Sequence, residues 1–312
     1  MWDRKGNRRR RNRARRARRG LTLFQVVAMF PDDATAEAWF ERRLWPRGPH
    51  CPRCGSLNVQ CGVAHPTMTH RCRDCPGRPL FSLRSGTLMR GSKLGYRVWA
   101  VALYLFATNL KGIASTKIAR EFGITQKAAW HLAHRVREAW GPREREAFGD
   151  AEADETFIGG KMRGGQGGRG KAVVAGVRER RTGRVRAEVV SDRRKRTLHR
   201  FVRDNVGPDA TLYTDEHRGY WGALESHERV NHSAGEYVSG MASVNGVESF
   251  WAALKRGYHG VFHYVSHKHL DRYVVEFAER HNARSLDTED LMARLAAGMA
   301  GRRLTYRELV AG

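Results

Sequence analysis

The chain has 312 residues, enough for one catalytic domain with one or two small modules, and its hydrophobic content of 41% excludes a globally disordered protein. It carries 57 Lys and Arg residues against 32 Asp and Glu residues, for a formal net charge of +25. This excess favours a polyanionic partner, because each phosphate that a protein neutralises releases counterions. The alternative is an arginine-rich composition set by a GC-biased genome. The longest apolar run, residues 98–107, is too short to span a bilayer, so we expect no membrane association.

Residues 1–20 are strongly basic: ten Arg residues and Lys5 stand against Asp3 alone, for a net charge of +10. Like charges repel and nothing apolar is present to bury, so we expect a disordered arm. The arm either binds DNA phosphates or is an artefact of a start codon assigned too far upstream. No apolar stretch follows it, which argues against a secretory signal. We therefore expect a cytoplasmic protein with reduced cysteines.

Residues 21–47 are expected to form a helical hairpin. Pro31 marks the end of the first helix, and Asp33 can cap the second, which is predicted over residues 34–45. Helical spacing predicts that the second helix buries Ala36, Phe40 and Leu44.

Residues 48–82 contain two Cys-x2-Cys turns that predict a zinc ribbon. Each turn presents two thiolates to one metal ion, and two turns complete a tetrahedral Zn²⁺ site. Three further residues between the turns, Cys61, His65 and His70, leave an exchange of ligands open, although Cys61 is interpreted as a spare. A zinc ribbon is structural, so it indicates binding and not catalysis. The expected ligands are Cys51, Cys54, Cys72 and Cys75.

Residues 92–141 are predicted to form a helical DNA-binding region. Within it, residues 115–125 match a helix-turn-helix with a turn at Gly123, and Thr125 would cap the second helix. The alternative is a helical pair that packs for its own sake. The second helix would expose Gln126, Lys127, His131 and Arg135, of which we expect Gln126, Lys127 and Arg135 to contact DNA.

The glycine-rich residues 159–170 match a phosphate-binding loop only in part. Ala172 stands where such a loop needs a hydroxyl residue to hold Mg²⁺, and an apolar strand follows instead of a helix. We therefore reject nucleotide binding and interpret the glycines as a flexible loop over DNA.

Acidic residues on predicted strands indicate metal chemistry. Three antiparallel strands, a helix and a further strand are the opening of a ribonuclease-H-like α/β sheet, whose first and fourth strands are neighbours. Asp154 on the first strand and Asp215 at the end of the fourth would then share metal ions. The predicted strands cover residues 152–158, 171–178, 184–190 and 211–215.

A helix over residues 244–256 supplies a third acid, Glu248. Asn245, Glu248 and Lys255 fall on one face of this helix. Three oxygen ligands suit Mg²⁺ or Mn²⁺, and two such ions would activate a nucleophile and stabilise the leaving oxygen in phosphoryl transfer. Lys255 and Arg256, two turns beyond Glu248, are expected to reach DNA phosphates.

With these motifs in place, the chain resembles bacterial insertion-sequence transposases of the ISXO-type branch, which join a zinc ribbon to a DDE catalytic domain. The resemblance covers residues 21–300 but not the basic arm. It implies Asp154, Asp215 and Glu248 as the catalytic triad, with Asn245 as an alternative third ligand. The matching segments are 154–161, 213–220, 231–238, 245–256 and 268–273, together with Gly260 and His263.

The resemblance predicts a ribonuclease-H-like transposase domain over residues 150–300. The expected activity is cleavage at the terminal inverted repeats of a mobile element and joining of the 3′-ends to target DNA. Double-stranded DNA is the expected partner, with a homo-oligomer assembled on it at the nucleoid. The alternatives are a structure-selective, metal-dependent nuclease that hydrolyses without joining, and an inactive or co-opted DNA-binding regulator.

Overall fold

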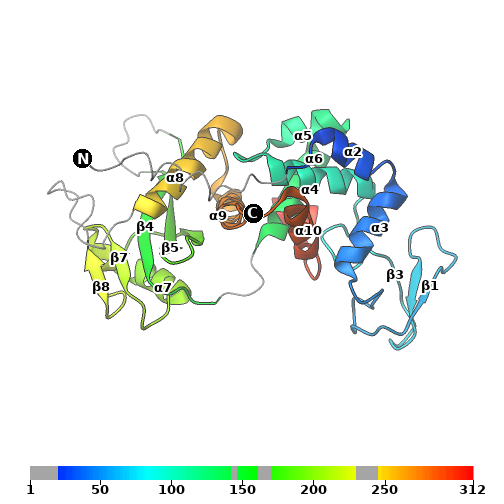
Figure 1. Cartoon of the computed structure of the whole chain (residues 1–312), viewed down its shortest axis with the longest axis horizontal. Helices are drawn as coiled ribbons and strands as arrows, with labels where there is room; N and C mark the ends of the chain where they lie inside the picture. The colour runs from blue at the N-terminus through cyan, green and yellow to red at the C-terminus, as the bar shows by residue number, and fades with distance from the viewer. Residues whose placement is uncertain (1–19, 142–145, 161–169, 230–244, 312) are drawn as a thin grey trace, which may run out of the picture.

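The computed structural model describes residues 20–141, 146–160, 170–229 and 245–311. The molecule is elongated, with a five-stranded sheet at one end, a small three-stranded sheet at the other, and helices between them (Figure 1). Within these ranges no helix combines the length and the apolar character needed to cross a membrane. The predicted basic arm, most of the glycine-rich loop and the segment 231–238 lie outside the described residues.

The N-terminal hairpin consists of α2 (Leu23–Met29) and α3 (Asp33–Leu44). Asp32 caps α3, because its side chain accepts the Thr35 amide at 2.7 Å, so the prediction of Asp33 as the cap is wrong by one residue. Asp33 instead accepts the amide of Arg97 at 2.8 Å and thereby ties α3 to the start of α4 (Tyr96–Thr108). The predicted buried residues of α3 are confirmed: Ala36, Phe40 and Leu44.

Beyond the hairpin, the small sheet is antiparallel in the order β1-β2-β3. Cys72 pairs with Val59, and His70 pairs with both Cys61 and Phe81. Such short strands bury little apolar surface of their own, although Cys72 and Phe81 are buried in the core that they share with α3 and α4. Its strands are β1 (Val59–Cys61), β2 (His70–Cys72) and β3 (Leu80–Phe81).

The predicted helix-turn-helix is formed by α5 (Ser115–Phe122) and α6 (Gln126–Trp140). Gly123 ends α5 with φ +62°, a left-handed conformation that favours glycine. Thr125 caps α6 by accepting the Ala128 amide at 3.2 Å, as expected.

Two C-terminal helices, α10 (Thr288–Gly298) and α11 (Tyr306–Val310), pack into the N-terminal core. Leu291 and Leu295 of α10 are buried in the same cluster as α3 and α4. The end of the segment 150–300, which the sequence assigns to the catalytic domain, therefore belongs to the N-terminal core. Periodicity identifies an apolar helix face but not the core that covers it.

The large sheet has the strand order β6-β5-β4-β7-β8. β4 pairs antiparallel with β5 and parallel with β7, where Ala151 pairs with Leu212 and Glu152 with Tyr213. The first and fourth strands are neighbours, as the predicted ribonuclease-H-like topology requires. The edge strand β8 was not predicted. The strands are β4 (Ala151–Ile158), β5 (Ala172–Glu179), β6 (Val185–Val190), β7 (Leu212–Thr214) and β8 (His227–Arg229).

Helices cover both faces of this sheet. On one face, α8 (Asn245–Gly257), the π-helix η3 (Tyr258–Phe262) and α9 (His267–Asn282) bury Val174. On the other face, α7 (Lys195–Asn205) and the 3-10 helix η1 (Arg218–Tyr220) bury Ala175 and Val177. Successive residues of a strand point to opposite faces, so neighbouring acids on β4 enter different surroundings.

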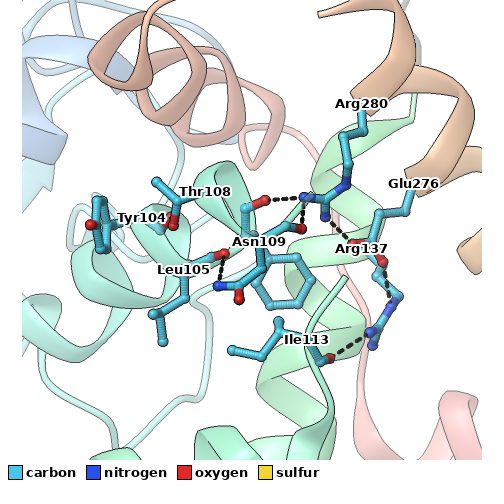
Figure 2. Close-up of polar contacts among 9 residues, drawn as sticks. Tyr104, Leu105, Thr108, Asn109, Ile113, Arg137, Glu276 and Arg280 are labelled. Carbon is cyan, nitrogen blue, oxygen red and sulfur yellow. Dashed lines mark hydrogen bonds and ion pairs between the residues drawn. The ribbon is translucent and has the colours of Figure 1, made fainter. Parts of the chain in front are cut away.

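Helix α9 contacts β6 and α8 as well as α6, and a buried ion network fixes its contact with α6 (Figure 2). Glu276 of α9, which is 0% exposed, accepts Arg137 Nε of α6 at 2.8 Å and also binds Arg280. Arg280 Nη1 donates to the carbonyls of Phe106 and Asn109 at 2.6 Å each. The end of α4, α6 and α9 are thereby joined in one network.

The Glu276→Gln substitution should destabilise the protein severely, because two buried guanidinium groups would lose their shared counter-charge. We expect the free energy of unfolding, measured by urea denaturation, to fall by roughly 3–5 kcal/mol. The control is Asp204→Asn, which breaks the exposed pair with Arg200 and should cost less than about 1 kcal/mol. Equal destabilisation of the two variants would contradict a special role for the buried network.

Candidate functional site

The four predicted zinc ligands lie together. The Sγ atoms of Cys51 and Cys75 are 3.8 Å apart, those of Cys54 and Cys72 are 3.7 Å apart, and all four lie within 4.8 Å of one another. A tetrahedral Zn²⁺ site with Zn–S distances of about 2.3 Å places its sulfurs roughly 3.8 Å apart. The geometry and the all-sulfur donor set therefore fit a structural zinc ion.

Backbone amides of the cysteine-containing turns donate hydrogen bonds to two of the sulfurs. The amide of Arg53 donates to Cys51 Sγ at 3.4 Å, and the amide of Cys75 donates to Cys72 Sγ at 3.3 Å. Hydrogen bonds of this kind stabilise thiolates, the form that binds metal.

The three residues between the knuckles lie outside this group. Cys61 is exposed on β1. His65 Nδ1 accepts the amides of Thr67 and Met68. His70 stacks on Phe81 with a ring separation of 5.4 Å. The alternative that Cys61, His65 or His70 replaces one of the four cysteines as a zinc ligand is therefore not what the structure shows.

The helix-turn-helix prediction requires that the side of α6 expected to contact DNA is exposed to solvent. The structure exposes only the first turn of this side. Gln126 and Lys127 are exposed, with Lys127 Nζ placed 4.4 Å above the ring of Tyr306. Arg135 is 8% exposed and donates to the carbonyls of Leu304 and Arg90 at 3.0 and 3.1 Å. The prediction of Arg135 as a DNA contact is therefore wrong, because the C-terminal segment covers its face of α6.

Asp154 and Asp215 come together at the junction of β4 and β7. Asp154 lies in the middle of β4, and Asp215 directly follows β7, which runs parallel beside it. Burial, together with the negative charges of Asp215 and Glu155, raises the pKa of Asp154 to about 7. A cation between the carboxylates of Asp154 and Asp215 would relieve their repulsion.

The indole of Trp251 orients the Asp154 carboxylate. Trp251 Nε1 of α8 donates to Asp154 Oδ2 at 2.9 Å. The indole lies over Gly176, the β5 residue that pairs with Asp154, and a Cβ at Gly176 would stand 2.6 Å from the ring. Helical spacing alone places Trp251 on the apolar face of its helix and does not reveal this contact. An isolated glycine within a strand is the sequence feature that indicates such a close approach.

A second acid on the same face of β4 anchors the start of α8. Glu152, which is buried, pairs with Arg178 Nη1 at 3.0 Å and accepts the amide of Val247 at 3.1 Å. A carboxylate at this position satisfies a free amide of the first helical turn and interacts favourably with the helix dipole. Glu152 therefore positions α8 and is not free to bind metal. Nothing in the local sequence around Glu152 indicates this role.

Glu155 points to the opposite face of β4. It pairs with Arg193 Nη1 at 3.2 Å and lies 3.8 Å from His217 Nε2. The amide of His217 in turn donates to Asp215 Oδ1 at 3.0 Å. The segment after β7 thus lies beside Glu155, and its own Asp215 binds the His217 amide.

The predicted third ligand stands one helical turn before Trp251. Glu248 is exposed in the first turn of α8, with Asn245 exposed at its first residue and Lys255 and Arg256 exposed in its last turn. Among the described residues, the four cysteines lie close enough together to hold one metal ion. Asp154, Asp215 and Glu248 do not form such a close group. Asp154 and Asp215 nevertheless lie near each other, and the helix that bears Glu248 packs against β4.

Comparison with known proteins identifies the same two modules. Residues 146–282 match the family described as the ISXO2-like transposase domain, and residues 31–77 match the transposase zinc-ribbon domain. A protein in transposable element ISH50 of Halobacterium salinarum is 26% identical over 279 residues, which cover 81% of this chain and 92% of the relative. A transposase-like protein of Haemophilus influenzae is 32% identical over 103 residues, which cover 32% of this chain and 81% of the relative.

Zinc content separates the ligands from the spare cysteine. Cys54→Ser should lose the metal and unfold the ribbon, because the small module has little core of its own. Cys61→Ser is the matched control and should keep one zinc ion per chain by elemental analysis. A Cys54→Ser protein with full zinc content, or a wild-type protein purified without chelator that holds none, would refute the four-cysteine site.

The close approach of Gly176 and Trp251 is tested by a double-mutant cycle. Gly176→Ala should lower the free energy of unfolding by roughly 1–3 kcal/mol, because the new methyl group overlaps the indole. In a Trp251→Phe background, where the smaller ring leaves space, the same substitution should cost clearly less. Gly260→Ala, whose Cβ would meet nothing within 4 Å, is the control. Equal costs of Gly176→Ala in both backgrounds would show that the indole is not the obstacle.

Proposed function

Because the chain belongs to the transposase family that carries an ISXO2-like transposase domain and a transposase zinc ribbon, we propose that it cuts DNA at the ends of a mobile element and joins those ends to target DNA. The observation that carries the proposal is the closeness of Asp154 and Asp215: Asp215 directly follows β7, which runs parallel beside β4, and its negative charge adds to burial in raising the pKa of Asp154. Two neighbouring carboxylates, one of them buried, are a suitable start for a divalent-metal site.

Asp154 and Asp215 would hold Mg²⁺ or Mn²⁺ together with a third ligand from α8. Residues three apart on a helix are neighbours on its surface, so Glu248 lies on the same side of α8 as Trp251, which touches Asp154. A carboxylate is also a better ligand than an amide for a hard cation, so Glu248 is favoured over Asn245. The bound metal supplies activation of water or a 3′-hydroxyl and stabilisation of the leaving oxygen.

The remaining residues position the reactants. Trp251 holds one carboxylate oxygen of Asp154, while Glu152 fixes α8 through the Val247 amide. Lys255 and Arg256 are exposed at the end of α8, where they are placed to contact DNA phosphates.

Duplex DNA is the proposed partner, with Gln126 and Lys127 at the exposed start of α6 as further contacts. Recognition helices of helix-turn-helix proteins commonly contact bases through their N-terminal residues. Since an element has two ends, we infer that two or more copies of the chain assemble on them.

The test of the third ligand compares Glu248→Gln with Asn245→Ala on labelled duplexes that carry an element end. Glu248→Gln should lower cleavage and joining by roughly 100-fold or more, because even substitutions around metal ligands cost about 10–100-fold. DNA binding should persist, since only a charge that repels phosphate is removed. Glu225→Gln, an exposed acid outside the proposed site, is the control.

The outcomes separate the alternatives. Joining by Glu248→Gln together with its loss in Asn245→Ala would transfer the third ligand to Asn245. Hydrolysed products without joined products from the wild-type protein would indicate a nuclease. Binding with neither product in Mg²⁺ or Mn²⁺ would indicate a DNA-binding regulator.

A further inference from the structure

A groove of about 740 Å³ separates the zinc ribbon from the segment that leads into α4. One wall is formed by the ribbon, including Cys51 and Arg53, and the other by the turns of residues 82–93. Phe81 and Tyr96, both nearly fully buried, form its apolar base. The zinc ribbon, which forms one wall of the groove, lies at one end of the long axis, and the sheet that carries Asp154 lies at the other (Figure 1).

The walls of this groove are held together by close backbone contacts. Gly86 lies against Pro52 of the first knuckle so closely that a Cβ at Gly86 would be 2.8 Å from Pro52 Cβ. The C-terminal segment fastens the same turn, because the Gly301 amide donates to the Gly86 carbonyl at 2.7 Å and the Leu88 amide donates to the Met299 carbonyl at 3.1 Å. The groove is therefore formed before any ligand arrives.

The lining of the groove is cationic. It contains four basic side chains, Arg53, Arg84, Arg90 and Lys93, and a single acid, Glu37. Arg84 is used internally, since its Nη1 donates to the Ser92 carbonyl at 2.7 Å and its guanidinium covers the Tyr96 ring. The other three are exposed and form no ion pair with another residue of the described ranges.

We propose that this groove binds the phosphodiester backbone of duplex DNA, with Arg53, Arg90 and Lys93 as the groups that meet phosphates. The inference rests on the proposed function for its DNA partner and adds a binding site distant from the acids. Exposed, unpaired cations on a preformed wall bind phosphates without a prior cost of breaking ion pairs. A binding site so far from the sheet positions the duplex and takes no part in bond cleavage.

The test measures the salt dependence of binding to a fluorescein-labelled duplex oligonucleotide in zinc-loaded, full-length protein without Mg²⁺. The triple variant Arg53→Ala, Arg90→Ala and Lys93→Ala should reduce the slope of log K against log salt by about 3, near one for each phosphate that is no longer neutralised. The matched control removes three exposed cations of α7 by Lys195→Ala, Arg196→Ala and Arg200→Ala. Its slope should change by less than about 1 if the groove is the specific binding site.

Equal slopes for the groove variant and the wild type, or equal reductions in the groove and α7 variants, would overturn the groove site. Circular dichroism and zinc content establish that each variant is folded. The groove variant should need more protein than the wild type for half-saturation of the duplex. A wild-type protein that binds no duplex would refute the DNA partner itself, which distinguishes failure of the proposed function from failure of the groove.

Discussion

The buried network of Arg137, Glu276 and Arg280 determines how the two halves of this molecule are joined. An isolated charge in a protein interior is costly, so each of these groups depends on the others being in place. Arg280 also takes up carbonyl groups at the end of α4, which have no partner within their own helix. The network therefore fixes α4, α6 and α9 relative to one another. Because α9 also packs on β6 and α8, the sheet and the helix-turn-helix are held in one arrangement.

That arrangement restricts which surfaces are available to DNA. Most of α6 is buried between α9, α10 and the C-terminal segment, so its first turn is the part left for the proposed contact with bases. The same C-terminal segment pins the turn at Gly86 that forms a wall of the cationic groove. The C-terminal residues thus shape two surfaces at once, although they lie far in the chain from both. A duplex that met the groove, α6 and α8 together would span much of the long axis.

The strand β4 shows how one short segment serves three purposes. Glu152 and Asp154 share a face, where the first anchors α8 and the second receives the Trp251 indole. Glu155 points to the other face, pairs with Arg193 and lies beside His217 in the segment that carries Asp215. Alternation along the strand separates Asp154, which is proposed to bind metal, from Glu155. Glu152 shares the face of Asp154 but is engaged by Arg178 and by the Val247 amide. The two structural acids are neutralised by arginines, whereas the pKa of Asp154 is raised.

Features encoded within a few residues could be predicted from the sequence. The Cys-x2-Cys turns, the Thr125 cap and the turn at Gly123 depend on local spacing, and the structure contains them. The order of strands around Asp154 and Asp215 could be predicted from the succession of strands and helix, which matches the opening of a ribonuclease-H-like sheet. Tertiary structure alone decided which faces stayed exposed. Arg135 binds a carbonyl 169 residues away, Trp251 meets Asp154 across 97 residues, and α10 packs in the N-terminal core. Periodicity specifies that a face is apolar or polar, but the partner that covers it is chosen by packing between distant segments, which local spacing does not encode.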